Sequence, residues 1–256
     1  MIEEQNSDFE RRKGLHPWLR RSPGSYLAET EKFQIDEILP DLFGYHLLQV
    51  GRLGSIDLLA HSRILHRCIV DIDGMGQPAP YPQVRGTARA LPVESDSVDV
   101  VLLPHVLEFD GHPHEALRES FRVLVPEGHL LISGFNPRST MGLWRLIRSR
   151  RAVAPWCGQF FSVNRIKDWL ALLGFDVLRV SPCFLRPHLQ HGQWLERLDA
   201  LGRLGNRTAP VFSGAYLMVA RKRITTLTPI RPSWRPKRRP VGVGLAEPSA
   251  RVVNGD

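Results

Sequence analysis

One stretch of the chain, Val98–Val106 (VDVVLLPHV), is apolar at nearly every position. A strand that is apolar on both sides must be covered on both faces, which is typical of the centre of a parallel sheet flanked by helices. Other apolar runs alternate with helical patterns, and strands are predicted at 46–50, 67–72, 129–133, 175–180 and 211–220. This alternation predicts an α/β fold with a parallel sheet.

Apolar residues at helical spacing predict four helices, at 26–39, 55–62, 113–123 and 162–173. Ser55 is expected to cap the second of them and His112 the third, while Gly174 would end the fourth. The Pro- and Gly-rich segment at 74–83 is expected to lack regular structure. Three regions follow from this pattern: a leading helical region 1–40, a main domain 41–223 and a tail 224–256.

The composition is that of a globular enzyme, with 43% hydrophobic and 23% charged residues among 256. No apolar stretch reaches the roughly 20 residues that a membrane span needs. The N-terminus (MIEEQNSDFERRKG) lacks the apolar core of a secretory signal. The three cysteines, Cys68, Cys157 and Cys183, are widely spaced and favour reduced thiols. Together these features predict a cytoplasmic protein without a transmembrane segment.

The net charge of +8 is unevenly distributed. From Ile224 onward the chain has six basic and two acidic residues, and this Pro- and Arg-rich segment shows no hydrophobic periodicity. Such a segment is expected to be disordered. Basic clusters of this kind contact nucleic acid or anionic surfaces in some proteins, and more often they are solvated surface. Both interpretations of the tail remain open.

The segment Leu47–Ser55 (LLQVGRLGS) runs from a predicted strand into a turn. Gly51 can turn the strand sharply, and Gly54 can supply a positive φ. Arg52 and Leu53 stand where a nucleotide-binding loop would leave its backbone bare. The segment is therefore either a cofactor loop or a plain connection between strand and helix.

Asp71 ends the predicted second strand, twenty positions after Gly51. An acid at about this spacing accepts hydrogen bonds from ribose hydroxyls in dinucleotide-binding folds. Its alternative role is that of an ordinary turn residue. The loop and the acid together favour a ligand site at the carboxyl edge of the sheet.

Two segments, ARALPVESDSVDVVLLPHVLEF and PHEALRESFRVLVPEGHLLISGFNP, resemble the type 11 branch of the class I S-adenosylmethionine-dependent methyltransferases. The resemblance runs from about Leu47 to Asn136, and RVLVPEG is its most specific part. It implies a Rossmann-like, seven-stranded, mostly parallel sheet with helices on both faces. It also implies S-adenosylmethionine as cofactor and methyl transfer to an unidentified acceptor, expected to be a small molecule.

The same resemblance assigns cofactor-binding positions. Gly51 matches the first glycine of the family's loop, and Asp71 matches its ribose-binding acid. Gln49 stands at the position of an acid before the loop, and Thr87 at that of the acid that reaches adenine. The later glycines of the loop are replaced, and Gly54 lies one position out of register, where a local slip would restore the loop. Because of these departures, a catalytically silent protein that serves as a binding or scaffold module is the alternative.

His105 and Glu108 follow the central strand in PHVLEF, where residues of the carboxyl edge should lie. His105 is the candidate for acceptor contact or general base, and Glu108 for orienting it or the cofactor. The alternative is a buried structural histidine. Two polar clusters, DGHPHE and HLQH, lack a recognised ligand spacing, so no metal site is predicted.

Overall fold

The computed structural model describes residues 12, 14–22, 24–71, 80–139, 142, 145, 154–183 and 213–223. The predicted tail 224–256 and the first two residues of the predicted strand 211–220 lie outside this part. The helices are α2 (Leu15–Leu19), α3 (Gly24–Ile38), α4 (Pro113–Val123) and α6 (Val163–Leu173), with a short 3-10 helix, η1, at Leu39–Asp41. The strands are β1 (His46–Val50), β2 (His66–Asp71), β3 (Gln83–Arg85), β4 (Val98–Pro104), β5 (Leu124–Phe135), β6 (Phe175–Cys183) and β7 (Ala215–Lys222).

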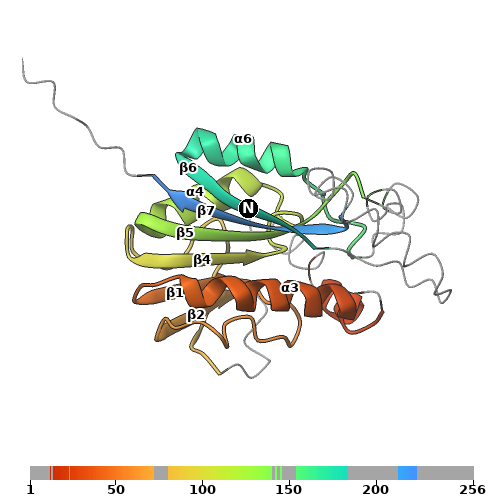
Figure 1. Cartoon of the computed structure of the whole chain (residues 1–256), viewed down its shortest axis with the longest axis horizontal. Coiled ribbons are helices and arrows are strands. Elements are labelled where there is room, and N and C mark those ends of the chain that lie inside the picture. The colour runs from red at the N-terminus through yellow and green to blue at the C-terminus, as the bar shows by residue number, and fades with distance from the viewer. Residues whose placement is uncertain are drawn as a thin grey trace, which may run out of the picture. The chain divides into compact units, whose positions relative to one another are not determined.

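The seven strands form one sheet in the order β3-β2-β1-β4-β5-β7-β6 (Figure 1). The pairs among β3, β2, β1, β4 and β5 are parallel, and β7 pairs antiparallel with both β5 and β6. The predicted seven-stranded, mostly parallel sheet is confirmed. Because β1, β2 and β4 are parallel neighbours, their carboxyl ends lie at the same edge.

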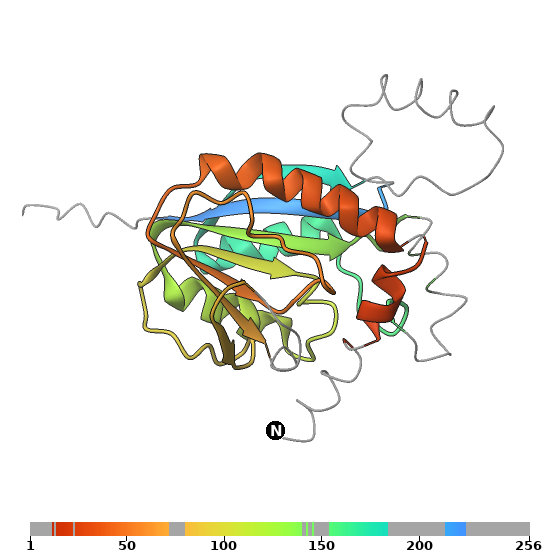
Figure 2. The same cartoon turned by 90° about the horizontal axis from the view of Figure 1, so that it is seen from below.

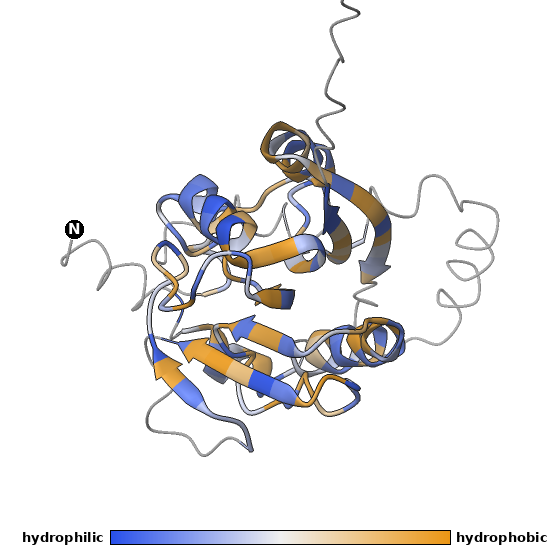
Figure 3. Cartoon of the chain, turned by 90° about the vertical axis from the view of Figure 1, so that its left-hand side faces the viewer, coloured by the Kyte–Doolittle hydropathy of each residue, from blue (hydrophilic) through white to orange (hydrophobic). Residues whose placement is uncertain are grey.

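Each face of the sheet is covered by its own hydrophobic cluster. On β4, Val100 and Leu102 belong to the cluster that contains buried residues of α2 and α3. The alternate residues, Val101 and Leu103, belong to the cluster of α4 and α6. Figure 2 shows α3 on one side of the sheet and α4 on the other, and Figure 3 shows apolar residues gathered on the strands. This two-sided burial explains why Val98–Val106 is apolar almost throughout.

Local signals set the ends of the two helices that pack on the second face. α4 begins with Pro113 at its first position, as predicted, although the His112 side chain makes no capping hydrogen bond. The Ser162 side chain accepts a hydrogen bond from the Arg165 backbone N–H, which caps α6. Gly174, at φ 91°, ends α6 in the left-handed conformation that glycine adopts without strain.

The prediction of a helix at 55–62 is wrong, because the structure has only turns and bends in this segment. Leu53, Leu58 and Leu59 are buried in the core without it. The Asp57 carboxylate accepts a hydrogen bond from the Leu59 N–H at 2.9 Å, and such local bonds compete with a helix. An eight-residue segment also gains little from helix formation alone.

Two strand predictions need correction. Gln83 was placed in a segment without regular structure, but it begins β3, because pairing with the edge of β2 supplies hydrogen bonds that the local sequence does not reveal. β5 begins at Leu124 rather than at 129. Its pairing with β4 is irregular between Val98 and Val100, and Glu127 adopts φ 65° there. The predicted VPEG turn is thus an irregularity within a longer strand.

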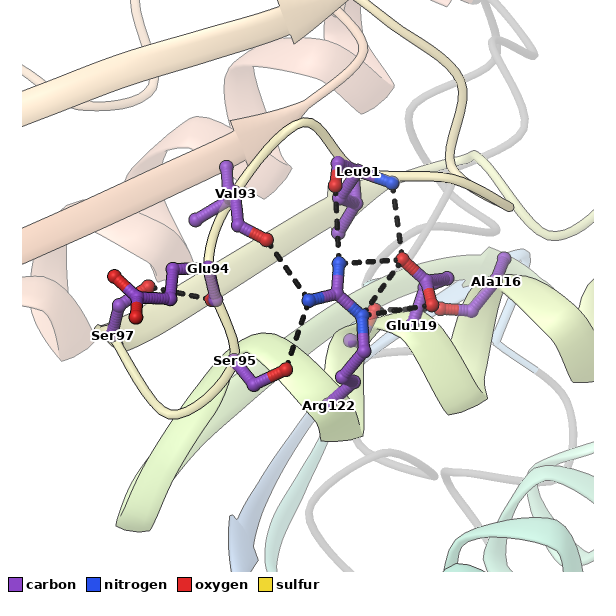
Figure 4. Close-up of polar contacts among 9 residues, drawn as sticks. Leu91, Val93, Glu94, Ser95, Ser97, Ala116, Glu119 and Arg122 are labelled. Atoms are coloured by element: carbon purple, nitrogen blue, oxygen red, sulfur yellow. Dashed lines mark hydrogen bonds and ion pairs between the residues drawn. The ribbon is translucent and has the colours of Figure 1, made fainter.

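Arg122, in the RVLVPEG motif, ties α4 to the segment that connects β3 with β4 (Figure 4). Its guanidinium donates to the backbone oxygens of Leu91 and Val93, to Ser95 Oγ and to both Glu119 oxygens. Hydrogen bonds with Glu119 raise the pKa of Arg122, so this charge is constant. The planar fork makes these bonds together, which a lysine could not do.

Candidate functional site

The predicted site residues meet at the carboxyl edge of the parallel strands. Gly51 follows β1, Asp71 is the last residue of β2, and His105 follows β4. The Gly51 N–H donates to the Val70 oxygen at 2.7 Å, so the ends of β1 and β2 are fixed side by side. Ligands of open α/β sheets bind at this edge.

Both glycines of the loop adopt the left-handed conformation, Gly51 at φ 76° and Gly54 at φ 62°. The predictions for their backbone are therefore confirmed. Leu53 is fully buried in the core below the sheet edge, so its bulk is taken up by packing. A Cβ on Gly54 would meet no atom within 4 Å, so open space lies beside this backbone.

Gln49 supports the loop from within the protein. Its side chain is 2% exposed, and its Nε2 donates to the Gly51 carbonyl at 2.8 Å. The bond holds the Gly51 peptide in one orientation. Gln49 therefore shapes the loop that the resemblance assigned to the cofactor.

Asp71 and Thr87 lie near the same edge, on neighbouring segments. Asp71 pairs with Arg85 in the register of β2 with β3, and Thr87 follows two residues later. Asp71 is 8% exposed. Thr87 Oγ1 is buried and has no hydrogen-bond partner. A buried hydroxyl without a hydrogen-bond partner is uncommon in folded proteins.

Sequence reasoning missed Arg12, which lies against this site. Its Nη2 donates to the carbonyl oxygens of Arg52 and Pro104, both at 3.2 Å. Its Nη1 lies 3.7 Å from Asp71 Oδ1. A Cβ on Gly51 would lie 1.9 Å from the same Nη1, so the guanidinium covers Gly51 directly. No local pattern around Arg12 predicted these contacts.

His105 is held between two carboxylates. The fully buried ring contacts Glu108 Oε1 through Nδ1 at 2.9 Å and Glu31 Oε1 through Nε2 at 2.8 Å. Glu108 Oε1 also accepts the Phe135 N–H at 2.8 Å. The ring stacks on Phe135, with centroids 4.1 Å apart. The cluster thereby joins α3, the end of β4 and the end of β5.

The two carboxylates keep this histidine protonated. Burial lowers the pKa of His105, but the negative charges of Glu31 and Glu108 and their hydrogen bonds raise it to about 10. At neutral pH the ring is an imidazolium whose two N–H groups both donate. Neither nitrogen is free to accept a proton from a substrate in this arrangement.

Glu31 was not predicted, although the sequence holds a signal for it. It lies in the apolar stripe of α3 with Leu27, Ala28, Ile35 and Ile38, and all five are buried. A charge on the buried face of an amphipathic helix needs a partner inside the protein. The second oxygens of Glu31 and Glu108 are buried without a hydrogen-bond partner.

The described residues also line a cavity away from this edge of the sheet. A cavity of about 690 Å³ lies at the opposite edge of the sheet, where its lining includes His46, His66 and Ser97. Across the part of the chain that the structure describes, no group of three or more His, Cys, Asp or Glu residues could hold a metal ion. No helix in that part is long and apolar enough to cross a bilayer.

Comparison with known proteins identifies relatives. A family model described as a methyltransferase domain matches residues 69–132. Uncharacterized protein YafS of Escherichia coli (strain K12) is 35% identical over 224 residues, covering 88% of this chain and 85% of YafS.

Solved structures give the same fold. An S-adenosylmethionine-dependent methyltransferase of Thermotoga maritima superimposes with a TM-score of 0.57 at 17% identity, covering 77% of this chain and 92% of that one. One from Mesorhizobium loti gives 0.53 at 16% identity, covering 75% and 98%. These likenesses confirm the expected fold.

Proposed function

Because the chain belongs to the class I S-adenosylmethionine-dependent methyltransferases, we propose that it transfers a methyl group from S-adenosylmethionine to an acceptor. One observation supports this above the others. The left-handed turn at Gly51, the Asp71 carboxylate and the unpartnered Thr87 hydroxyl lie at one edge of the sheet. They offer a backbone contact, a diol acceptor and a hydrogen bond for a base.

The residues present fit the adenosine part of the cofactor. Asp71 would accept hydrogen bonds from the two ribose hydroxyls, since a carboxylate provides two acceptor oxygens. Thr87 Oγ1 would accept a hydrogen bond from the adenine amino group. Gly54 leaves space for the ligand to approach the backbone, and Gln49 holds the loop that forms this wall.

Methyl transfer asks for alignment more than for acid or base groups. The bound cofactor supplies an activated methyl on a sulfonium, and the chain orients the acceptor and excludes water. We assign His105 and Glu108 to positioning, because both nitrogens of the imidazolium donate to carboxylates. They fix α3 and the residue after β4 next to the site.

The alternative is a catalytically silent relative that binds other molecules through the same fold. The loop favours it, because two later glycine positions of the family are occupied by Leu53 and Ser55. Leu53 is buried in the core, however, so its side chain does not occupy the space beside the loop backbone. A measurement of cofactor binding distinguishes the two functions, because the methyltransferase must bind S-adenosylmethionine and the silent relative should not.

Calorimetric titration with S-adenosylhomocysteine tests the proposal on the full chain. Wild type should bind, and Thr87→Val should bind about 5- to 10-fold more weakly, because one hydrogen bond contributes about 1 kcal/mol. Its unfolding free energy should change little, since the hydroxyl has no protein partner. Thr30→Val, on α3, is the matched control and should bind as wild type does.

Absence of heat and of a thermal shift at millimolar ligand would contradict the proposal and leave the silent module. Equal binding by Thr87→Val and wild type would contradict the assigned adenine contact.

A further inference from the structure

We propose that Arg12 is an intramolecular competitor of the cofactor, and that its guanidinium must leave the carboxyl edge before the cofactor binds. The inference rests on the proposed function and adds a device that controls access to the site. The supporting observations are the contacts of Arg12 with Arg52, Pro104 and Asp71, which lie at the carboxyl ends of β1, β4 and β2.

Arg12 fills the space beside Gly51. The guanidinium lies where a side chain of Gly51 would be, with Nη1, Nη2 and Cζ all within 2.2 Å of an ideal Cβ. A nucleoside that approaches the Gly51 backbone needs the same space. The two groups therefore cannot occupy it together.

Arg12 also occupies hydrogen-bond acceptors of the site. Among the described residues it bonds to the carbonyl oxygens of Arg52 and Pro104 and lies beside the carboxylate of Asp71. The ribose hydroxyls of a bound nucleoside would donate to the same carboxylate, so the guanidinium competes with the ligand for Asp71.

The position of Arg12 in the chain keeps it near the site. It lies just before α2, where Leu15 and Leu19 are buried and Trp18 packs edge-on against Phe135 with centroids 6.1 Å apart. This anchoring keeps the guanidinium at a high effective concentration near the site.

The magnitude follows from the fraction of molecules in which the site is open. If Arg12 covers Gly51 in about nine molecules of ten, the apparent dissociation constant rises about tenfold. Removing the side chain should remove this factor.

Calorimetric titration of the full chain with S-adenosylhomocysteine tests the proposal. Arg12→Ala should bind about 5- to 10-fold more tightly than wild type. Arg20→Ala is the matched control, because Arg20 is exposed in the same segment, and it should bind as wild type does. Equal or weaker binding by Arg12→Ala would overturn the proposal, since it would mean that Arg12 is neutral or holds the ligand.

A second measurement needs no ligand. Amides of residues 51–54 should exchange hydrogen several-fold faster in Arg12→Ala than in wild type or Arg20→Ala, because the guanidinium covers this loop. Unchanged exchange would refute the contact itself. Faster exchange without nucleoside binding in any variant would support the contact, refute competition with the cofactor and contradict the proposed function.

Discussion

The buried His105 should make the stability of the protein fall as the pH rises above neutrality. The unfolded chain binds the imidazole proton with a pKa near 6.5, and the folded chain holds it to about 10. The folded state therefore binds this proton more tightly, and the stabilisation is complete below pH 6.5. It decreases as the pH rises and is lost as the pH passes 10.

The size of the effect follows from the same shift. Each pKa unit corresponds to about 1.4 kcal/mol, so a shift of this size corresponds to at most ~5 kcal/mol of unfolding free energy. This is a large part of the 5–15 kcal/mol that typical domains possess. Urea unfolding followed by circular dichroism, repeated at several pH values, would measure the decline.

Glu31→Gln identifies the origin of the decline. It removes one of the two negative charges beside the ring, so the pKa of His105 should fall, and the decline in stability should be smaller and should end at a lower pH. Glu29→Gln, at an exposed position of α3, should behave as wild type. A shared midpoint for wild type and Glu31→Gln, or an imidazole NMR signal of His105 that titrates near pH 6.5, would refute the reasoning.

Two further predictions concern α6 and the motif at the end of α4. Ser162→Ala should lower the unfolding free energy by about 1 kcal/mol, because the cap to the Arg165 N–H is lost, and an unchanged urea midpoint would contradict this. Arg122→Lys should cost about 1–3 kcal/mol, because lysine cannot make the forked bonds to the β3–β4 segment. Arg118→Lys, exposed on the same helix, is its control, and equal urea midpoints for the two variants would refute the role of the fork.

Sequence patterns predicted the parts of the fold that depend on period and local signals. The uniform apolarity of β4, the proline at the start of α4 and the glycine after α6 each act within a few residues, and the structure agrees with all three. The prediction of a helix at 55–62 failed because an irregular segment buries the same leucines that a helix would bury. The spacing of apolar residues could not distinguish the two structures. β3 was not predicted, because its hydrogen bonds come from pairing with β2 and no pattern within its own three residues indicates a strand.

The candidate site was predictable where it follows from strand ends. Gly51, Asp71 and His105 each follow or end an apolar strand, and parallel pairing brings them to one edge. Arg12 and Glu31 could not be found in this way, because they reach the site from segments that precede the sheet in the chain. Their contacts bridge 59 and 74 positions respectively, from Arg12 to Asp71 and from Glu31 to His105.

The Glu31–His105 contact makes α3, a helix that precedes the sheet in the chain, part of the buried core. A protein that started at residue 41 would retain every strand of the sheet but leave an interior cation with one carboxylate instead of two. The His105 ring would lose its proton far more readily. Phe135, which stacks on this ring, would lose its contact with Trp18. Shortened versions of this protein should therefore retain α2 and α3 together with the sheet.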